Sequence, residues 1–520
     1  MVRKQETELQ PALNRLIEAG LLFRQGLPPH ATYLFKHALV QDVAHGSLLR
    51  STRQQLHQQI AEELEAHAPD LMESQPGLIA QHYAEAGLVE KSVAYWLKAG
   101  RSSAARSANL EAIAYLRRGI EATVGLGNGA EKDRVELDLQ YALGPCLIAT
   151  QGPISDEARA TFARAHELCE RLNGPPEHLS VLYWLAAVQA VRGNLSKALE
   201  VTERGIVLAE ARGDRPALVN SLRGTGLGLL LIGRFIAGRN MIERAIATFD
   251  ASSDAEQSAA RAAGQDAGAA GLAVMSWALW ALGYSDTAVA RMTAALERAD
   301  AIGHPHTQAY VCHYASVLYA LRGEPVLANR QAERCFNLSQ EHGFGHWSRP
   351  SRIVCEASRS LLDRMSGAID GAQRELKDLG YQMGITALYV VVSEALVLRD
   401  RSSPLIDVVA AGLETLGRTD ERFLEAELYR LKARAVLARC ADDAGQMEAE
   451  SLLREALATA RRQGARAIEL RAAMSLAHLW RDQGKTAEAR ELLAPVYGWF
   501  TEGFDTRDLK EAKGLLEELQ

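Results

Sequence analysis

The stretch Ser276-Trp-Ala-Leu-Trp-Ala-Leu-Gly-Tyr-Ser-Asp-Thr-Ala288 contains a glycine, Gly283, with a small residue seven positions before it and another five positions after it. Further glycines of the chain have small residues at both of these positions: Gly87, Gly193, Gly233, Gly323 and Gly484. The pattern predicts a repeated pair of helices. A left-handed glycine ends the first helix, and small side chains lie where the two helices cross.

This register resembles the tetratricopeptide repeat (TPR) and predicts an all-α fold, a right-handed TPR-like α-solenoid of helical hairpins. At about 40 residues per unit, we expect roughly ten or eleven hairpins between residues 70 and 505. The composition agrees, since the chain is 48% hydrophobic but only 6% aromatic, and small side chains suit closely packed helices. The small, polar stretch Ala251–Gly271 predicts a long loop or a frayed helix.

The first 68 residues follow a different pattern. Apolar residues recur at helical spacing in Leu9–Ala19, and Leu21–Arg24 with Ala31–Phe35 predicts a short β-hairpin. Helices are expected at His37–Leu49 and Arg53–Ala66. One helix and a hairpin form only the second half of a winged-helix fold, so we expect apolar faces left uncovered and a chain that begins inside a domain.

These patterns divide the chain into three parts. We expect a partial winged-helix-like segment at residues 1–68, TPR-like repeats at 69–505 and a C-terminal capping helix at 506–520.

Two stretches carry a further resemblance. Tyr33-Leu-Phe-Lys-His-Ala-Leu-Val-Gln-Asp-Val-Ala44 and Leu493-Ala-Pro-Val-Tyr-Gly-Trp-Phe-Thr-Glu-Gly-Phe-Asp505 resemble bacterial multidomain signalling proteins with a class III adenylate/guanylate cyclase, an AAA-type ATPase and TPR repeats. The resemblance implies that this chain corresponds to the region after the ATPase module. The catalytic modules of that family would lie upstream of residue 1, so we expect no enzyme activity from this chain.

Charge and cysteine content restrict the partners. With 58 Lys+Arg against 65 Asp+Glu the net charge is −7, which leaves no basic footprint for nucleic acid. None of the six cysteines occurs in a Cys-x-x-Cys pair, so we expect reduced thiols. The longest apolar run, Ile385–Val392, is too short to span a membrane. These features predict a cytoplasmic protein without nucleic-acid or membrane partners.

Candidate catalytic, cofactor and metal sites are weak. Gly233-Arg-Phe-Ile-Ala-Gly-Arg-Asn240 has phosphate-loop spacing but lacks its Lys and Ser/Thr, so we interpret both glycines as part of the repeat. Glu167-Leu-Cys-Glu-Arg171, after His166, lacks the second histidine of a zinc helix. We therefore predict no catalytic residues, no cofactor and no metal.

Two other groups of histidines have ligand-like spacing. His304, His306 and His313, with Cys312, are interpreted as capping or surface residues, and the glycines between His342 and His346 predict a loop there.

Binding is better supported than catalysis. In the resembled repeats, first-helix positions ten, six, three and two residues before each glycine line a concave groove. Those positions predict a groove for a protein or peptide ligand that contains Tyr183, Arg223, Trp277, Trp280, His313, His478 and Arg481. Trp277 and Trp280 have the alternative of being core residues, since large aromatics on Ala-rich helices usually fill gaps.

The function expected from the sequence is a non-enzymatic, protein-binding regulatory or sensor arm of a cyclase–ATPase signalling protein, with the cyclase–ATPase module as a possible partner. The alternative is a fragment of an ATP-dependent transcription regulator of the same ATPase superclass.

Overall fold

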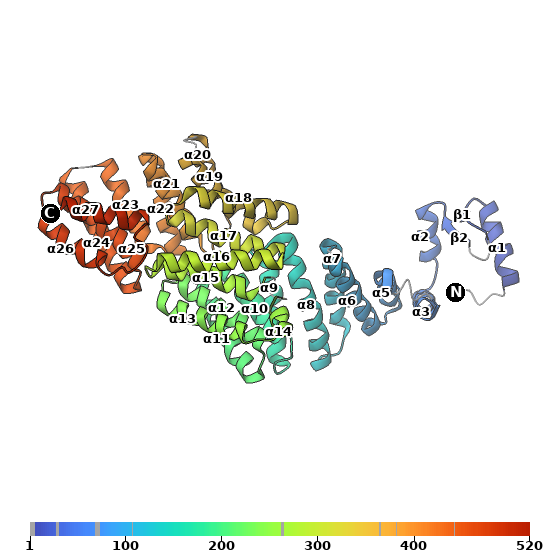
Figure 1. Ribbon diagram of the computed structural model, residues 1–520. Helices are drawn as coiled ribbons and strands as arrows, with labels where there is room; N and C mark the ends of the chain where they lie inside the picture. Colours follow the sequence, from blue (N-terminus) through green and yellow to red (C-terminus); the bar gives the residue numbers. More distant parts are fainter. Residues whose placement is uncertain are drawn as a thin grey trace. The chain divides into compact units, whose positions relative to one another are not determined.

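Figure 1 shows the computed structural model of the chain, which describes residues 6–27, 31–67, 73–106, 108–261, 265–362, 366–380, 382–440 and 442–520. The described residues fold as an all-α, TPR-like solenoid of helical hairpins, with strands only in one two-stranded sheet. Two compact units are present: Met1–Thr150 with Glu167–Pro175, and Gln151–His166 with Pro176–Gln520. Among the described residues, every helix is too short or too polar to span a lipid bilayer.

The N-terminal segment contains the predicted helices and hairpin. Its elements are α1 (Glu6–Glu18), β1 (Leu22–Gln25), β2 (Thr32–Phe35), α2 (Ala38–Gly46) and α3 (Arg50–His67). The strands pair antiparallel, with Phe23 opposite Leu34. Among its described residues, the buried hydrophobic side chains are Leu22 and Ala61. The expected boundary between residues 68 and 69 lies outside the described residues.

The rest of the first unit consists of helices that pack on their neighbours in the chain. They are α5 (Pro76–Ala86), α6 (Val89–Ala105), α7 (Asn109–Ala122), the 3-10 turn η1 (Thr123–Gly125) and α8 (Ala130–Gln151), followed by α9 (Asp156–Arg171) at the division between the units.

In the second unit, helices from α10 onward pair as hairpins, with the short α14 added between two pairs. The helices are α10 (His178–Val191), α11 (Leu195–Arg212), α12 (Arg215–Leu231), α13 (Phe235–Asp250), α14 (Asp254–Ala260), α15 (Ala267–Ala281), α16 (Ser285–Ile302), α17 (Pro305–Leu321), α18 (Pro325–His342), α19 (Gly345–Leu362), α20 (Ser366–Lys377), α21 (Ile385–Leu398), α22 (Ser402–Arg418), α23 (Glu425–Arg439), α24 (Asp443–Gln463), α25 (Arg466–Asp482), α26 (Thr486–Tyr497) and α27 (Arg507–Glu518).

The glycine register is confirmed. All six glycines have positive φ, from 76° at Gly323 to 96° at Gly283, and most non-glycine residues avoid this region. The small residues lie at the helix crossings: a Cβ added to Gly238 would be 2.9 Å from the carbonyl oxygen of Gly226 on the facing helix. Gly233 and Gly238 therefore serve the turn and the α12–α13 crossing, which accounts for their phosphate-loop spacing.

Of the two alternatives for Ala251–Gly271, the long loop is wrong for most of the stretch and the helical one is closer, since the stretch contains the short helix α14 and the start of α15. Helix α14 begins with a capping box, in which the Ser253 side chain accepts from the Glu256 backbone and the Glu256 carboxylate accepts from the Ser253 N–H. Asp266 caps α15 by accepting from the N–H of Ala269 at 2.8 Å. The caps satisfy the free N–H groups of both helix starts, and alanine favours the helices that follow. Residues 262–264 lie outside the described residues.

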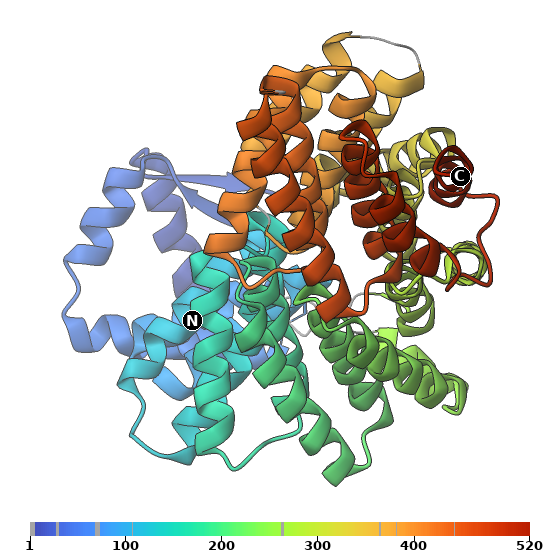
Figure 2. The ribbon, with the colours of Figure 1, turned by 90° about the vertical axis from the view of Figure 1, so that its left-hand side faces the viewer.

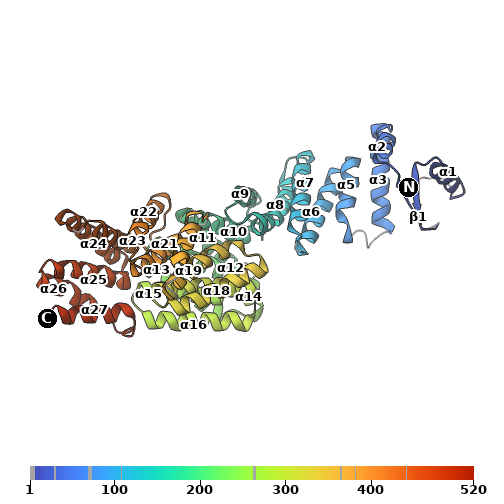
Figure 3. The ribbon, with the colours of Figure 1, turned by 90° about the horizontal axis from the view of Figure 1, so that it is seen from above.

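In the second unit, helices late in the sequence pack beside helices from much earlier in it. The carbonyl oxygen of Val191 accepts from the N–H of Gln382 at 2.9 Å, and that of Leu231 accepts from Arg422 at 2.7 Å. Helix α25 also contacts α15, and Figures 2 and 3 show the red C-terminal helices beside the yellow-green ones. Because both faces of the inner helices are covered, α15, α17 and α21 are buried almost all round.

Candidate functional site

Four of the seven predicted groove residues converge in the second unit. The Trp277 and Tyr314 rings lie 4.5 Å apart, and the His313 and Tyr314 rings 5.8 Å apart, between centroids. Tyr183 and Tyr314 both act electrostatically on the guanidinium of Arg223. We call this group, with Tyr310 and Gln265, the Arg223 cluster.

The other three predicted residues lie elsewhere. The Trp280 ring is 5.4 Å from the guanidinium of Arg471. His478 is exposed, and Arg481 pairs with Asp482 at 2.9 Å and with Glu518 at 2.5 Å. His478 and Arg481, which both lie on α25, are thus separate from the Arg223 cluster.

Four of the predicted groove residues are buried and do not line an open groove. Trp277 and Trp280 are each 2% exposed, Arg223 is 4% exposed and His313 is 8% exposed. Trp277 stacks on Phe423 of a later repeat, with centroids 5.3 Å apart and ring planes 2° from parallel. The two tryptophans are thus core residues, the alternative that the sequence left open, because later repeats cover the inner face of the earlier ones.

The Arg223 guanidinium is held by neutral groups. With its amide oxygen facing the guanidinium, Gln265 accepts from both terminal nitrogens at 3.2 Å, and the ionisable groups that act on Arg223 are phenols. Among the described residues, its Nε has no acceptor, and no carboxylate lies within the 4.0 Å of a salt bridge. A buried charge normally has an ionic partner. Because Arg223 has no acidic partner among the described residues, its positive charge is uncompensated there.

Two other arginines of the second unit have that partner: Arg471, which is buried, and Arg430, whose side chain is 13% exposed. Arg430 lies 2.8 Å from Glu427 and also pairs with Glu394. Arg471 lies 2.7 Å from Asp508. Arg223 is therefore unusual in charge compensation rather than in burial.

Two further polar atoms of the Arg223 cluster, Tyr310 Oη and His313 Nδ1, have no hydrogen-bond partner among the described residues. Burial lowers the pKa of His313 to about 4, so the imidazole is neutral at pH 7. Burial also raises the pKa of Tyr310, which keeps its phenol protonated. The cluster therefore presents one positive charge with uncharged neighbours, an arrangement that stabilises an anion.

A cavity of about 700 Å³ lies near the paired arginines. Its charged lining residues are Glu394, Arg399, Asp400, Arg471, Arg507 and Asp508. Three positive and three negative side chains balance each other, and apolar residues such as Leu321 and Val391 complete the wall. The lining favours no single sign of ligand charge.

The histidines singled out in the sequence have structural partners. His304 caps α17, with Nδ1 accepting from the Thr307 N–H at 3.3 Å. His306 Nε2 accepts from the Trp347 indole at 3.3 Å. The loop predicted between His342 and His346 is present at Gly343 and Phe344, but it is shorter than expected, because Gly345 already begins α19 and His346 lies in that helix. Burial, with His306 and His313 nearby, lowers the pKa of His346 to about 3.

Sequence reasoning missed part of the Arg223 cluster. Tyr310 and Tyr314 are four residues apart on α17, on the same side as His313, and their rings stack at 4.6 Å. That spacing was available in the sequence. Gln265 comes from the connection before α15 and gave no local signal.

No known protein family matches the chain. The chain is 27% identical, over 484 residues, to an uncharacterized protein of Rhizobium meliloti (strain 1021). The match covers 91% of this chain but 46% of the relative, so the chain spans about half the length of the curated relative it matches.

Three solved structures are similar to parts of the chain. Yeast Tom70 has a TM-score of 0.35 at 12% identity and covers 83% of this chain and 96% of its own. A human IFIT1 dimer with m7Gppp-AAAA has a TM-score of 0.39 at 12% identity, covering 78% and 89%. The APC/C hetero-tetramer Cut9–Hcn1 has a TM-score of 0.34 at 11% identity, covering 93% and 99%.

Proposed function

We propose that the chain is a non-enzymatic scaffold that binds protein, and that it serves as the regulatory or sensor arm of a signalling protein with cyclase and ATPase modules. The observation that carries the proposal is the apolar surface of the N-terminal segment. On the β-hairpin, Phe23 is 55% exposed and Leu34 52%; on α2, Leu39 is 76% exposed and Val43 70%. We call these four side chains the N-terminal apolar surface.

Such a surface marks a place where another protein packs. Phe23 and Leu34 are directly opposed across the hairpin, and Leu39 and Val43 are four residues apart on α2, so each pair shares a face. Grouped exposed hydrophobics indicate interaction sites, whereas scattered single ones do not. The partner that covers them removes apolar area from water, which favours association.

The occupant we propose is the ATPase module. The stretch Tyr33–Ala44 contains three of the four surface residues, Leu34, Leu39 and Val43. It is also the stretch that resembles the junction after that module. More than half of the Rhizobium meliloti relative lies outside the match, which is consistent with further modules in that protein.

The test is binding of the purified chain to a purified ATPase module of the resembled family, measured by calorimetry. We expect saturable binding that is lost in a Leu39→Glu, Val43→Glu variant. The matched control is Leu110→Glu, Val124→Glu, since these side chains are also 76% and 80% exposed but lie outside the surface. Absence of binding by the unmodified chain, or equal loss in both variants, contradicts the proposed partner.

A second measurement tests the absence of catalysis. The purified chain is incubated with ATP and Mg²⁺, and both phosphate release and cyclic-nucleotide formation are followed. We expect neither above the buffer blank. Turnover that co-purifies with the chain contradicts the scaffold proposal.

A further inference from the structure

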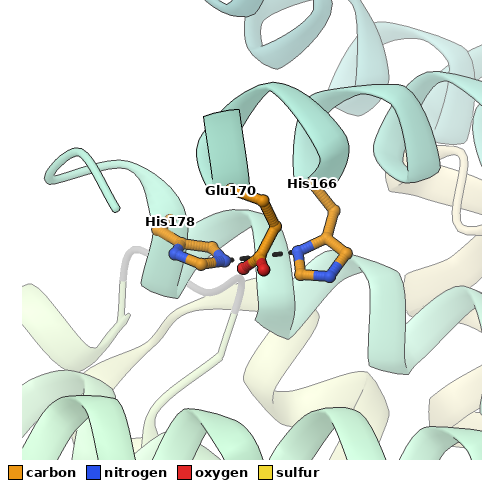
Figure 4. Close-up of side chains that lie close together, drawn as sticks. All are labelled: His166, Glu170 and His178. Atoms are coloured by element: carbon orange, nitrogen blue, oxygen red, sulfur yellow. Dashed lines mark hydrogen bonds between the residues drawn. The ribbon is translucent and has the colours of Figure 1, made fainter. Parts of the chain in front are cut away.

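Three side chains with metal-ligating atoms converge at the α9–α10 hairpin. His166 and Glu170 lie one turn apart on α9, and His178 is the first residue of α10. One ligand atom from each residue lies within 4.8 Å of the other two. Figure 4 shows the Glu170 carboxylate beside the line that joins the two imidazoles.

The local chain geometry fixes this convergence. His166 and Glu170 share a helix face because they are four residues apart. After α9, Asn173 and Gly174 both have positive φ, 56° and 73°, and the chain turns back so that α10 begins near the end of α9. His178 Nε2 then lies 3.2 Å from His166 Nδ1.

The distance between the two imidazole nitrogens suits a shared ion. Two ligand atoms at zinc–nitrogen bond length in tetrahedral geometry lie roughly 3.3–3.4 Å apart, close to the observed 3.2 Å. Two imidazoles and one carboxylate are also a donor set that Zn²⁺ uses in proteins. A direct hydrogen bond between the histidines has the same nitrogen separation, so dependence of metal affinity on Glu170 is what distinguishes the two arrangements.

We propose that His166, Glu170 and His178 bind a divalent transition-metal ion, with Zn²⁺ the best match to the donor set. The ion links the end of α9 to the start of α10 across the connecting turn. His178 is buried, His166 is half-buried and Glu170 is exposed, so an ion reaches the site from the side of Glu170. This site is independent of the N-terminal apolar surface and its partner.

Another histidine group offers a contrast. His45, His57 and His82 form a row, with nitrogen separations of 3.2 Å and 2.8 Å. Among the described residues, the α9–α10 group is the one that places three ligand atoms within 4.8 Å of one another. The row thus provides a matched control with similar imidazole spacing.

The experiment titrates Zn²⁺ into the chelator-treated full chain by isothermal calorimetry at pH 7.5. We expect one specific site and a rise in melting temperature on saturation. Glu170→Gln and His178→Gln are each expected to weaken affinity by at least the ~10–100-fold that loss of even an outer-shell partner costs. His57→Gln is expected to leave the affinity unchanged.

The exposed position of Glu170 keeps the test informative if His178→Gln fails to fold, because Glu170→Gln leaves the interior intact. Binding is also expected to weaken at acid pH, because a protonated imidazole nitrogen has no lone pair to offer the ion. Absence of a saturable site, or affinity that depends on His57 and not on Glu170, overturns the proposal.

Discussion

Glu502 accepts hydrogen bonds from both the backbone N–H and the hydroxyl of Thr287, at 2.9 and 2.8 Å, although 215 positions separate the two residues. Thr287 lies in the first turn of α16, so a carboxylate from a distant repeat caps this helix. Asp420 similarly accepts from the N–H of Ser196 in the first turn of α11, at 3.0 Å. Acidic side chains at helix starts thus connect later repeats of the second unit to earlier ones.

The first prediction concerns this distant cap. Glu502→Ala removes the acceptor of the N–H groups of Asp286 and Thr287, so we expect a loss of about 1–3 kcal/mol in unfolding free energy. Urea denaturation followed by circular dichroism measures it. The control is Glu491→Ala on the exposed side of α26, expected to change stability by less than about 0.5 kcal/mol. Similar losses in both variants contradict a capping role.

The second prediction concerns the α12–α13 crossing. A Cβ at Gly238 would lie 2.9 Å from Gly226 O and 3.0 Å from Leu230 N, and backbone atoms move little, so Gly238→Ala is expected to cost about 1–3 kcal/mol. Gly417→Ala on α22 meets open space and is expected to stabilise by up to about 1 kcal/mol, because alanine favours helix. Thermal unfolding checks the opposite signs. Equal effects refute the close crossing.

The third prediction compares Arg223 with Arg430. Arg223→Met removes a charge without an acidic partner, so we expect stability to stay within about 1 kcal/mol of the original or to rise. Arg430→Met removes the nearest cation of both Glu427 and Glu394 and leaves Glu427 with Arg471 at 3.6 Å, and we expect a loss of about 3–5 kcal/mol. Denaturant unfolding of both variants gives the comparison. A large loss for Arg223→Met means that this arginine has an anionic partner in solution.

The fourth prediction concerns the interior tryptophans. Because Trp277 and Trp280 are each 2% exposed, truncation of either to alanine leaves a cavity and is expected to cost about 3–5 kcal/mol. His478→Ala, at an exposed position of the predicted groove, is expected to cost less than about 0.5 kcal/mol. Melting temperatures measure all three variants. Unchanged melting of Trp277→Ala contradicts its place in the core.

The sequence predicts what depends on near neighbours in the chain. Gly233 and Gly238 could be assigned to a turn and a crossing because both belong to one hairpin and recur at fixed spacing. Glu502 could not be assigned to Thr287, since nothing local marks a contact across 215 positions. His178 was missed for the same reason: the zinc-helix pattern looks for a second histidine on the same helix, whereas the structure places it on the next one.

The last prediction concerns Glu421, which caps α21 from inside the second unit. Its carboxylate accepts from the N–H of Gly384 at 2.8 Å and from the N–H of Thr386 at 3.0 Å, and the side chain is fully buried. Burial raises the pKa of Glu421 to about 7, even though these hydrogen bonds favour the charged form. The folded state therefore holds this proton more tightly than the unfolded state does.

The sign of the pH effect follows from that difference. Below pH 4.5, the ordinary pKa of this group, the carboxyl is protonated in both states and its contribution to stability is complete. As pH rises from 4.5 to about 7 the unfolded chain loses the proton first, so this contribution falls by up to about 1.4 kcal/mol per pH unit. Glu421→Gln cannot titrate and is expected to flatten this part of the profile, although it weakens the cap.

Urea unfolding at pH 5, 6, 7 and 8 measures the difference in free energy between the original chain and Glu421→Gln, which is expected to shrink or change sign as pH rises to 7 and then to level off. Glu414→Gln, an exposed position on α22, is the control and should follow the original profile. Because other groups titrate equally in both proteins, the difference isolates Glu421. A difference that is constant from pH 5 to 8 means that Glu421 does not hold its proton in the folded state.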